Sequence, residues 1–391
     1  MRRPVAFYAP LKPPDHPTPS GDRRMARALL RALAIIEQPV ELASRLRSYD
    51  RSGDPVRQRR IEALGERLAA RLLRRYRASA TPPRAWLTYH AYHKSPDWLG
   101  PAVAAALDIP YLLAEASFAP KQAGGPWARG HAASERAICQ ADVVLALTAR
   151  DATCLAPLIA PPAELRRLPP FLDPRPYQAA LAGRERHRAA LAARFGLDPE
   201  QPWLLAVAMM REGVKRHSYL LLADALGRLR DRSWQLLVVG AGPAQPEIEV
   251  VLKRLGPARV AFAGAVPEAA LAAYYAAADL YVWPAVGEAY GLAMLEAQAT
   301  GLPVIAGREG GVAEVVRDGL TGFLIEPRDP AAFALAADRL LADPGLRRTM
   351  GLAAGRFVAE ERSLRQAAAT LAAALADAQE IRAARRCRLC S

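Results

Sequence analysis

Short apolar runs alternate with longer amphipathic segments along nearly the whole chain. This alternation is typical of parallel strands that are covered on both faces by crossover helices. In the first half, the pattern predicts buried strands at residues 5–9, 86–89, 111–114 and 143–147. It predicts helices between them at residues 23–36, 56–77, 101–107 and 135–140. The first half is therefore expected to be one doubly wound α/β unit.

The same alternation starts again after a proline-rich break. Residues 168–176 contain four prolines, which is typical of a crossing between domains, and a charged helix is predicted after them at residues 184–195. Further strands are predicted at residues 203–208, 234–239, 260–263, 280–283, 304–306 and 322–325. The last helix is the alanine-rich segment 364–384. We therefore expect four parts: an N-terminal Rossmann-like domain (1–175), an interdomain linker (176–199), a C-terminal Rossmann-like domain (200–365), and a helix and tail (366–391) that packs back toward the first domain.

The composition is that of a globular protein. The chain has 391 residues, of which 52% are hydrophobic, and its longest apolar runs fall far short of the roughly 20 residues of a membrane span. The N-terminus lacks the pattern of a secretory signal, and four cysteines make no disulfide framework. We therefore expect a cytoplasmic protein with reduced thiols. Cys387 and Cys390 have the spacing of half a zinc site, which leaves a frayed tail, intermolecular zinc binding or redox chemistry as alternatives.

The net charge of +14 belongs entirely to the first half. Residues 1–195 hold 31 Lys and Arg against 17 Asp and Glu, whereas residues 196–391 hold 22 of each sign. Much of the excess lies in the predicted helix 56–77, which is amphipathic and rich in arginine. One interpretation is a solvated face of a helix docked on its own domain. Another is a surface for an acidic lipid or a polyanionic substrate, whereas no recognised module supports nucleic-acid binding.

The strongest chemical signal is the segment 287–297, which joins a predicted strand to a predicted helix. Glu288 lies before the helix and Glu296 lies inside it, so two carboxylates eight residues apart can face one ligand. The free amides of residues 290–293 at the helix start suit a phosphate. A carboxylate suits the paired hydroxyls of a ribose, because its oxygens accept several hydrogen bonds.

This segment resembles the Glu-x7-Glu signature of retaining glycosyltransferases of family 4, the glycosyl transferases group 1. The resemblance covers most of the chain and implies the GT-B fold, in which two Rossmann-like domains face each other across a cleft. It also implies a nucleotide-diphosphate sugar as donor, with no metal and no cofactor. In the family a basic pair after the first strand of the C-terminal domain grips the pyrophosphate. Arg211 and Lys215 match that pair, with a spacing that departs by one residue.

The N-terminal half carries the acceptor candidates. Ser20 and Gly21 enter the first helix, where their amides are placed to approach a phosphate or the acceptor. His90 and His93 lie in a polar and aromatic cluster that suits a sugar, and no third ligand at metal spacing accompanies them. Glu115 ends a strand at a position where the family often has histidine. It is expected either to stabilise the reacting sugar or to be a buried carboxylate paired with an arginine.

Together these motifs and the family that they resemble imply a retaining glycosyltransferase in cell-envelope or polysaccharide biosynthesis. Arg211, Lys215, Glu288 and Glu115 are the expected catalytic residues. Residues 240–243 resemble the family's Gly-x-Gly turn, and residues 262–267 resemble its segment near the nucleotide base. The expected donor-binding residues are therefore Gly21, Gly240, Val266, Tyr290, Gly291, Leu292 and Glu296. The expected acceptor is a sugar or a lipid-linked sugar, and the basic first half suggests peripheral attachment to the inner face of an anionic membrane. A nucleotide-sugar epimerase of the same fold and a non-catalytic protein that binds a polyanion or a membrane are the alternatives.

Overall fold

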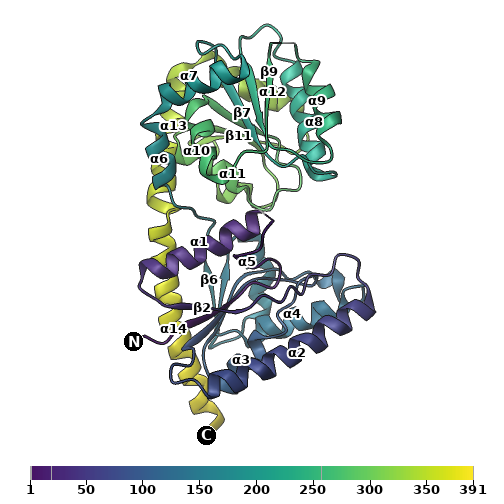
Figure 1. Ribbon diagram of the computed structural model, residues 1–391, viewed down its shortest axis with the longest axis vertical. Coiled ribbons are helices and arrows are strands. Elements are labelled where there is room, and N and C mark those ends of the chain that lie inside the picture. The colour runs from purple at the N-terminus through teal and green to yellow at the C-terminus, as the bar shows by residue number, and fades with distance from the viewer. Residues whose placement is uncertain (1, 19, 257, 391) are drawn as a thin grey trace. The chain divides into compact units, whose positions relative to one another are not determined.

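The computed structural model describes residues 2–18, 20–256 and 258–390, with the backbone alone at residues 388–390. These residues form two compact units (Figure 1). The first unit combines the chain up to Pro169 with the residues from Leu364 onward, and the second unit runs from Pro170 to Ser363. Each unit is built on a six-stranded parallel sheet. The predicted α/β fold of two doubly wound units is therefore confirmed.

The sheet of the first unit has the strand order β2-β1-β3-β4-β5-β6. Its strands are β1 (Val5–Tyr8), β2 (Val40–Ser44), β3 (Ala85–Ala91), β4 (Tyr111–Ala116), β5 (Val143–Ala146) and β6 (Glu164–Arg167). Its helices are α1 (Gly21–Ile35), α2 (Pro55–Arg77), α3 (Gly100–Leu107), α4 (Ala128–Gln140), α5 (Ala149–Leu155) and α14 (Leu364–Cys390), with short 3-10 turns at Pro120–Gln122 and Ala156–Leu158. The two strands that the pattern did not predict, β2 and β6, are the edges of this sheet.

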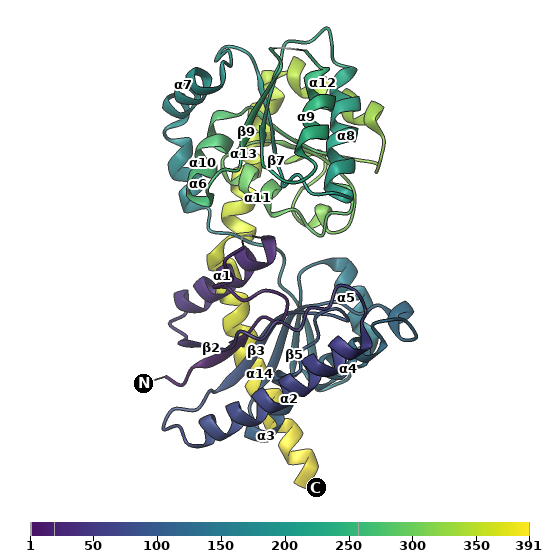
Figure 2. The same ribbon diagram turned by 45° about the vertical axis from the view of Figure 1, so that its right-hand side comes forward.

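Helices cover both faces of the first sheet. Alternate strand residues such as Tyr8, Trp86 and Leu113 point to one face, where they form an apolar core with residues of α2, α3 and α4. Helices α1 and α14 pack together on the other face (Figures 1 and 2). Because the central strands are buried on both sides, their sequences are continuous apolar runs.

The sheet of the second unit has the order β12-β11-β10-β7-β8-β9. Its strands are β7 (Trp203–Val207), β8 (Gln235–Val239), β9 (Val260–Gly264), β10 (Leu280–Trp283), β11 (Val304–Gly307) and β12 (Gly322–Ile325). Its helices are α6 (Arg175–Leu181), α7 (Arg184–Phe195), α8 (Val214–Gly227), α9 (Gln245–Lys253), α10 (Glu268–Ala277), α11 (Leu292–Ala299), α12 (Pro330–Ala342) and α13 (Pro344–Glu361), with a 3-10 turn at Val312–Glu314. Counted from β7, this is the Rossmann order 3-2-1-4-5-6.

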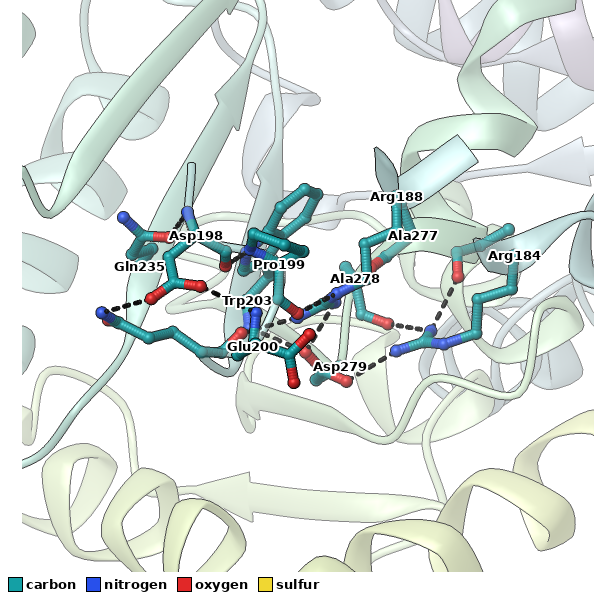
Figure 3. A network of polar contacts seen from close by, with 12 residues as sticks. Arg184, Arg188, Asp198, Pro199, Glu200, Trp203, Gln235, Ala277, Ala278 and Asp279 are labelled. Carbon is teal, nitrogen blue, oxygen red and sulfur yellow. Dashed lines mark hydrogen bonds and ion pairs between the residues drawn. The ribbon is translucent and has the colours of Figure 1, made fainter. Parts of the chain in front are cut away.

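Residues 176–199 are not the linker that the sequence suggested. They form most of α6 and all of α7, and both helices pack on α10 of the second unit. Arg184 Nη2 lies 2.6 Å from Asp279 Oδ1 and Arg188 Nη1 lies 3.0 Å from Asp279 Oδ2 (Figure 3). The two guanidinium groups also bind the last carbonyls of α10, where the negative end of the helix dipole favours cations. The chain therefore leaves the first unit near Pro169, before the charged helix.

Helix α14 belongs to the first unit, where it contacts α1, β4 and β5. It continues to Cys390 rather than ending in a frayed tail, and the thiol of Cys387 is exposed. Within the described part of the chain, every helix is too short or too polar to cross a bilayer.

Candidate functional site

In the second unit, the chain order reverses between the adjacent strands β7 and β10. Ligands of doubly wound sheets bind outside the carboxyl ends of the strands at such a reversal, because the two following loops run in opposite directions and leave a crevice. The loop after β7 leads to Lys215 in the first turn of α8, and the loop after β10 carries Glu288. The topology therefore brings these two predicted residues together.

Lys215 and Glu288 form an ion pair at this edge. Lys215 Nζ binds Glu288 Oε2, and the ammonium group lies 5.4 Å from the centroid of the Trp283 ring. Trp283 Nε1 also lies 3.3 Å from Glu288 Oε2, to which it donates. The side chains of Lys215 and Glu288 keep 23% and 17% of their surface exposed, so both remain within reach of a ligand. A cation on an aromatic face beside a carboxylate is a site that can exchange the carboxylate for a phosphate.

Glycines allow the loops at this edge to approach each other closely. Gly240 has φ +144°, and a Cβ there would lie 1.9 Å from the carbonyl oxygen of Ala208 in the loop after β7. Gly310 has φ +56°, and a Cβ there would lie 1.9 Å from the carbonyl oxygen of Glu288. Any larger residue would push these loops apart. The glycines therefore fix the backbone around Lys215 and Glu288.

The start of α11 faces the same edge. Gly291 precedes the helix in the left-handed conformation with φ +74°, and Tyr290 beside it is buried. Leu292 is the first helical residue and is half-buried. The first amides of a helix have no partner within the helix, so this end offers donors to an anion. One turn further along, Glu296 is only 2% exposed and accepts a hydrogen bond of 2.8 Å from the hydroxyl of Tyr275.

The remaining predicted donor residues lie on neighbouring loops. Arg211 is exposed in the loop between β7 and α8. Val266 is half-buried just after β9, beside the end of β8 that carries Gly240. Gly21 is in the other unit, in the first turn of α1, where a Cβ would meet no atom within 4 Å. The backbone at Gly21 is therefore open to a ligand but does not itself require glycine.

The first unit has its own reversal of chain order, between β1 and β3. Asp22 follows β1 on α1, His90 lies near the carboxyl end of β3, and Glu115 lies near the carboxyl end of β4. His90 Nδ1 is 3.1 Å from Asp22 Oδ1 and 3.3 Å from Glu115 Oε1. The fold thus brings one imidazole and two carboxylates together at the carboxyl edge of the sheet. Glu115 is paired with this histidine.

The electrostatics of this cluster favour a protonated imidazole. Burial by itself would lower the pKa of His90, but the nearby charges of Glu115, Asp22 and Asp151 outweigh burial and raise that pKa to about 9. Burial raises the pKa of the Glu115 carboxyl, and the His90 charge opposes that rise. At neutral pH the cluster therefore holds an imidazolium group against two carboxyl groups.

Backbone strain marks the same place. His90 and Glu115 have φ values of +59° and +56°, a conformation that non-glycine residues adopt at a cost of about 1–3 kcal/mol and that concentrates at functional sites.

The other two predicted acceptor residues lie outside this cluster. Ser20 caps α1, because its hydroxyl oxygen accepts a hydrogen bond of 3.2 Å from the amide of Arg23. His93 lies farther along the loop, with its ring centroid 5.9 Å from that of Trp127.

Sequence reasoning missed three residues that the fold adds to these sites. Asp22 and Asp151 act on His90, and Tyr275 binds Glu296. Asp22 stands next to the predicted pair Ser20 and Gly21, so its place in the first turn was a usable signal. Asp151 and Tyr275 come from helices far along the chain and carry no local signature. Among the residues that the structure describes, no three His, Cys, Asp or Glu side chains are arranged to hold a metal ion.

Comparisons with known sequences point to one family. Residues 201–343 match the family model described as glycosyl transferases group 1. A stretch of 254 residues is 33% identical to the GDP-mannose-dependent alpha-(1-6)-phosphatidylinositol monomannoside mannosyltransferase of Mycolicibacterium smegmatis, and it covers 62% of this chain and 64% of that protein. A stretch of 177 residues is 38% identical to the D-inositol 3-phosphate glycosyltransferase of Streptomyces griseus, over 43% and 37% of the two chains. The similarity thus spans less than two thirds of either relative.

Solved structures share the fold over almost the whole chain. Sucrose-phosphate synthase from Thermosynechococcus elongatus superimposes with a TM-score of 0.72 at 22% identity, covering 95% of this chain and 98% of the other. HepE from Anabaena, in a complex with UDP and glucose, superimposes with a TM-score of 0.69 at 17% identity, covering 95% and 99%. At these identities the likeness concerns the fold. Residues 201–343 of the second unit are thus similar to the glycosyl transferases group 1, and the chain as a whole shares the GT-B fold of these solved structures.

Proposed function

We propose that this protein transfers a sugar from a nucleotide-diphosphate sugar to an acceptor, with retention of the anomeric configuration, in cell-envelope or polysaccharide synthesis. The observation that carries the proposal is the Lys215–Glu288 pair at the strand reversal of a Rossmann-type sheet, beside the start of α11. The family of the second unit and the names of the two relatives support it.

In this proposal the donor is held by the second unit. Its diphosphate replaces Glu288 as the partner of Lys215, and Arg211 in the preceding loop adds a second positive charge. The released Glu288 then accepts hydrogen bonds from the donor sugar. Glu296, oriented by Tyr275, accepts those of the ribose. Gly240, Val266, Tyr290, Gly291 and Leu292 supply the backbone around the nucleotide.

The proposed reaction breaks the bond between the anomeric carbon and the diphosphate oxygen and forms a bond from that carbon to the acceptor hydroxyl oxygen. The hydroxyl proton leaves with the diphosphate. Negative charge grows on the leaving oxygen in the transition state, and fixed cations stabilise it more there than in the ground state. Lys215 and Arg211 would do this without a metal ion or another cofactor.

We assign the acceptor to the first unit. His90 and Glu115 present a proton donor and a carboxyl group at the carboxyl edge of the sheet, where they can orient an acceptor hydroxyl and stabilise positive charge on the reacting sugar. Gly21 leaves the start of α1 open to the donor phosphate, and Ser20 and His93 flank the acceptor.

The surface of α2 favours an anionic acceptor or membrane. Arg59, Arg60, Arg67, Arg71 and Arg74 are exposed along this helix, and none of them has an acidic partner among the described residues. Clustered arginines of this kind bind anionic lipid, at about 1 kcal/mol for each charge near the surface. The mycobacterial relative is named for a phosphatidylinositol monomannoside. We therefore propose a peripheral protein of the inner membrane face with a lipid-linked or anionic acceptor.

The test is donor turnover by Lys215→Ala, with Lys253→Ala as the matched control because Lys253 is an exposed lysine of the same unit paired with Glu249. UDP-, GDP- and ADP-sugars would be assayed with and without EDTA. We expect kcat/KM to fall about 100-fold or more in Lys215→Ala and to stay unchanged in the control and with EDTA. Full activity of Lys215→Ala would refute the phosphate assignment. Donor consumption without any acceptor would favour an epimerase, and binding of anionic vesicles without turnover would favour a non-catalytic protein.

A further inference from the structure

A second basic site lies in the first unit, at the sheet edge opposite His90. It is a pocket of about 300 Å³ at the amino ends of the adjacent strands β1, β3 and β4. Arg3 lies two residues before β1, Arg84 lies directly before β3, and both line one side of the pocket. Arg382 and Arg386, one turn apart on α14, line another. The pocket therefore joins the start of the sheet to the C-terminal helix of the same unit.

The charges of this pocket do not balance. Asp108 is the one carboxylate among its lining residues, and it pairs with both Arg382, at 3.0 Å from Nε to Oδ1, and Arg386. Arg3 donates to the carbonyls of Pro82 and Pro83, at 2.8 and 2.9 Å. The pocket thus holds four guanidinium groups and one carboxylate, a net charge of +3.

The excess positive charge of the pocket acts on the guanidinium group of Arg84. Its Nη1 donates at 3.2 Å to the amide oxygen of Gln38, which is neutral, and no carboxylate within the described chain pairs with it. Burial, together with the charges of Arg2 and Arg3, lowers the pKa of Arg84. The protein therefore holds this guanidinium among like charges without compensation, a cost that an anion would remove.

The geometry of the pocket suits phosphate better than a single carboxylate. Carbonyl groups hold Arg3 and the Gln38 amide holds Arg84, so these guanidinium groups are fixed in place before a ligand arrives, and each keeps further N–H groups for a planar pair of oxygens. A charge of +3 matches a phosphate or a diphosphate. The volume is near the lower limit of small-molecule sites, which leaves room for part of the group that carries the phosphate.

We propose that this arginine pocket (Arg3, Arg84, Arg382 and Arg386) binds a phosphate-bearing ligand, either a free organic phosphate or the phosphate of a lipid headgroup. This site is separate from the proposed donor site, since all its residues belong to the first unit. Binding there would tie α14 to the start of the sheet. This proposal does not depend on the proposed transferase activity.

The test uses the full chain with Lys215→Ala as background, so that the proposed phosphate site of the second unit does not contribute. Pyrophosphate binding would be measured by calorimetry for Arg84→Gln, for Arg84→Lys and for the control Arg51→Gln, an exposed arginine of the same unit. Sedimentation with phosphatidylcholine vesicles, with and without phosphatidic acid, would test the lipid source. We expect Arg84→Gln to weaken the binding of pyrophosphate or of the phosphatidic acid vesicles about tenfold. Arg84→Lys should weaken that binding less, and Arg51→Gln should leave it unchanged.

The outcomes separate the two sources. Weakened pyrophosphate binding identifies a free phosphate ligand, and weakened vesicle binding alone identifies a lipid phosphate. Equal binding of both probes by Arg84→Gln and Arg51→Gln overturns the proposal. Melting of the ligand-free variants gives an independent check, because relief of repulsion predicts that Arg84→Gln melts no lower than the background protein. A lower melting temperature would show that Arg84 is structural and would also overturn the proposal.

Discussion

The pairing of His90 with Glu115 and Asp22 predicts a pH-dependent stability of the first unit. The pKa of His90 is raised from 6.5 to about 9 by these carboxylates against the effect of burial. Because the folded unit binds this proton more tightly than the unfolded chain, the stabilisation is complete below pH 6.5 and is lost as the pH rises through 9. The difference between the two pKa values corresponds to about 3 kcal/mol.

The perturbation that tests this is Glu115→Gln, which removes the charge that raises the pKa of His90 most and keeps the size of the side chain. Glu66→Gln on the exposed face of α2 is the control. The pKa of His90 would be read from NMR titration of the imidazole ring, with His90→Gln to assign the signal among the six histidines. We expect a value near 9 in the starting protein and a lower value in Glu115→Gln.

The same prediction can be tested by the free energy of unfolding of the first unit, measured in urea at several pH values. The free energy of unfolding should fall between pH 6.5 and 9 in the starting protein and in Glu66→Gln, and this fall should shrink in Glu115→Gln and vanish in His90→Gln. Titration of His90 near pH 6.5 would refute the reasoning, since it would mean that the carboxylates do not act on the imidazole. An unchanged fall in His90→Gln would refute it equally.

Three further predictions concern the second unit. Asp279→Asn should lower its free energy of unfolding by about 2–4 kcal/mol in urea, because two arginines of α7 lose their carboxylate partner; a change below 1 kcal/mol would contradict this. Gly240→Ala should cost more than about 2 kcal/mol in the same assay, since its Cβ would meet the carbonyl oxygen of Ala208; wild-type stability would show that the loop yields freely. Tyr275→Phe should raise the donor KM more than it lowers kcat in steady-state assays, because Glu296 loses an orienting hydrogen bond of 2.8 Å; an unchanged KM would separate Glu296 from donor binding.

The strands that the sequence predicted are those composed mostly of apolar residues. All six strands of the second sheet, its partly buried edges β9 and β12 included, and the four inner strands of the first are rich in apolar residues, which are visible without any partner. The two missed strands, β2 and β6, lie at the sheet edges and are only partly buried, with the sequences VELAS and ELRR. Their pairing with β1 and β5 makes them strands, and an apolar pattern cannot report that pairing.

Residues 184–195 are a second case in which the sequence pattern does not report long-range contacts. The proline-rich break and the charged helix after it look like a linker when read along the chain. Only the fold shows that Arg184 and Arg188 bind the end of α10 and Asp279, about 90 residues later, and so belong to the second unit. A charged face is ambiguous in sequence, because solvent and a distant carboxylate satisfy it equally well.

The candidate functional residues also show what the sequence indicates and what only the fold decides. Sequence alone indicated Glu288 and Glu296, which lie eight residues apart in one local motif, and it indicated Lys215 through the family resemblance. The tertiary structure decided which groups meet: Lys215 with Glu288 across 73 residues, and His90 with both Asp22 and Glu115. The physical reason is that periodicity reports which side of its own element a residue occupies. Strand order, which places distant loops at one edge of a sheet, is set by long-range packing.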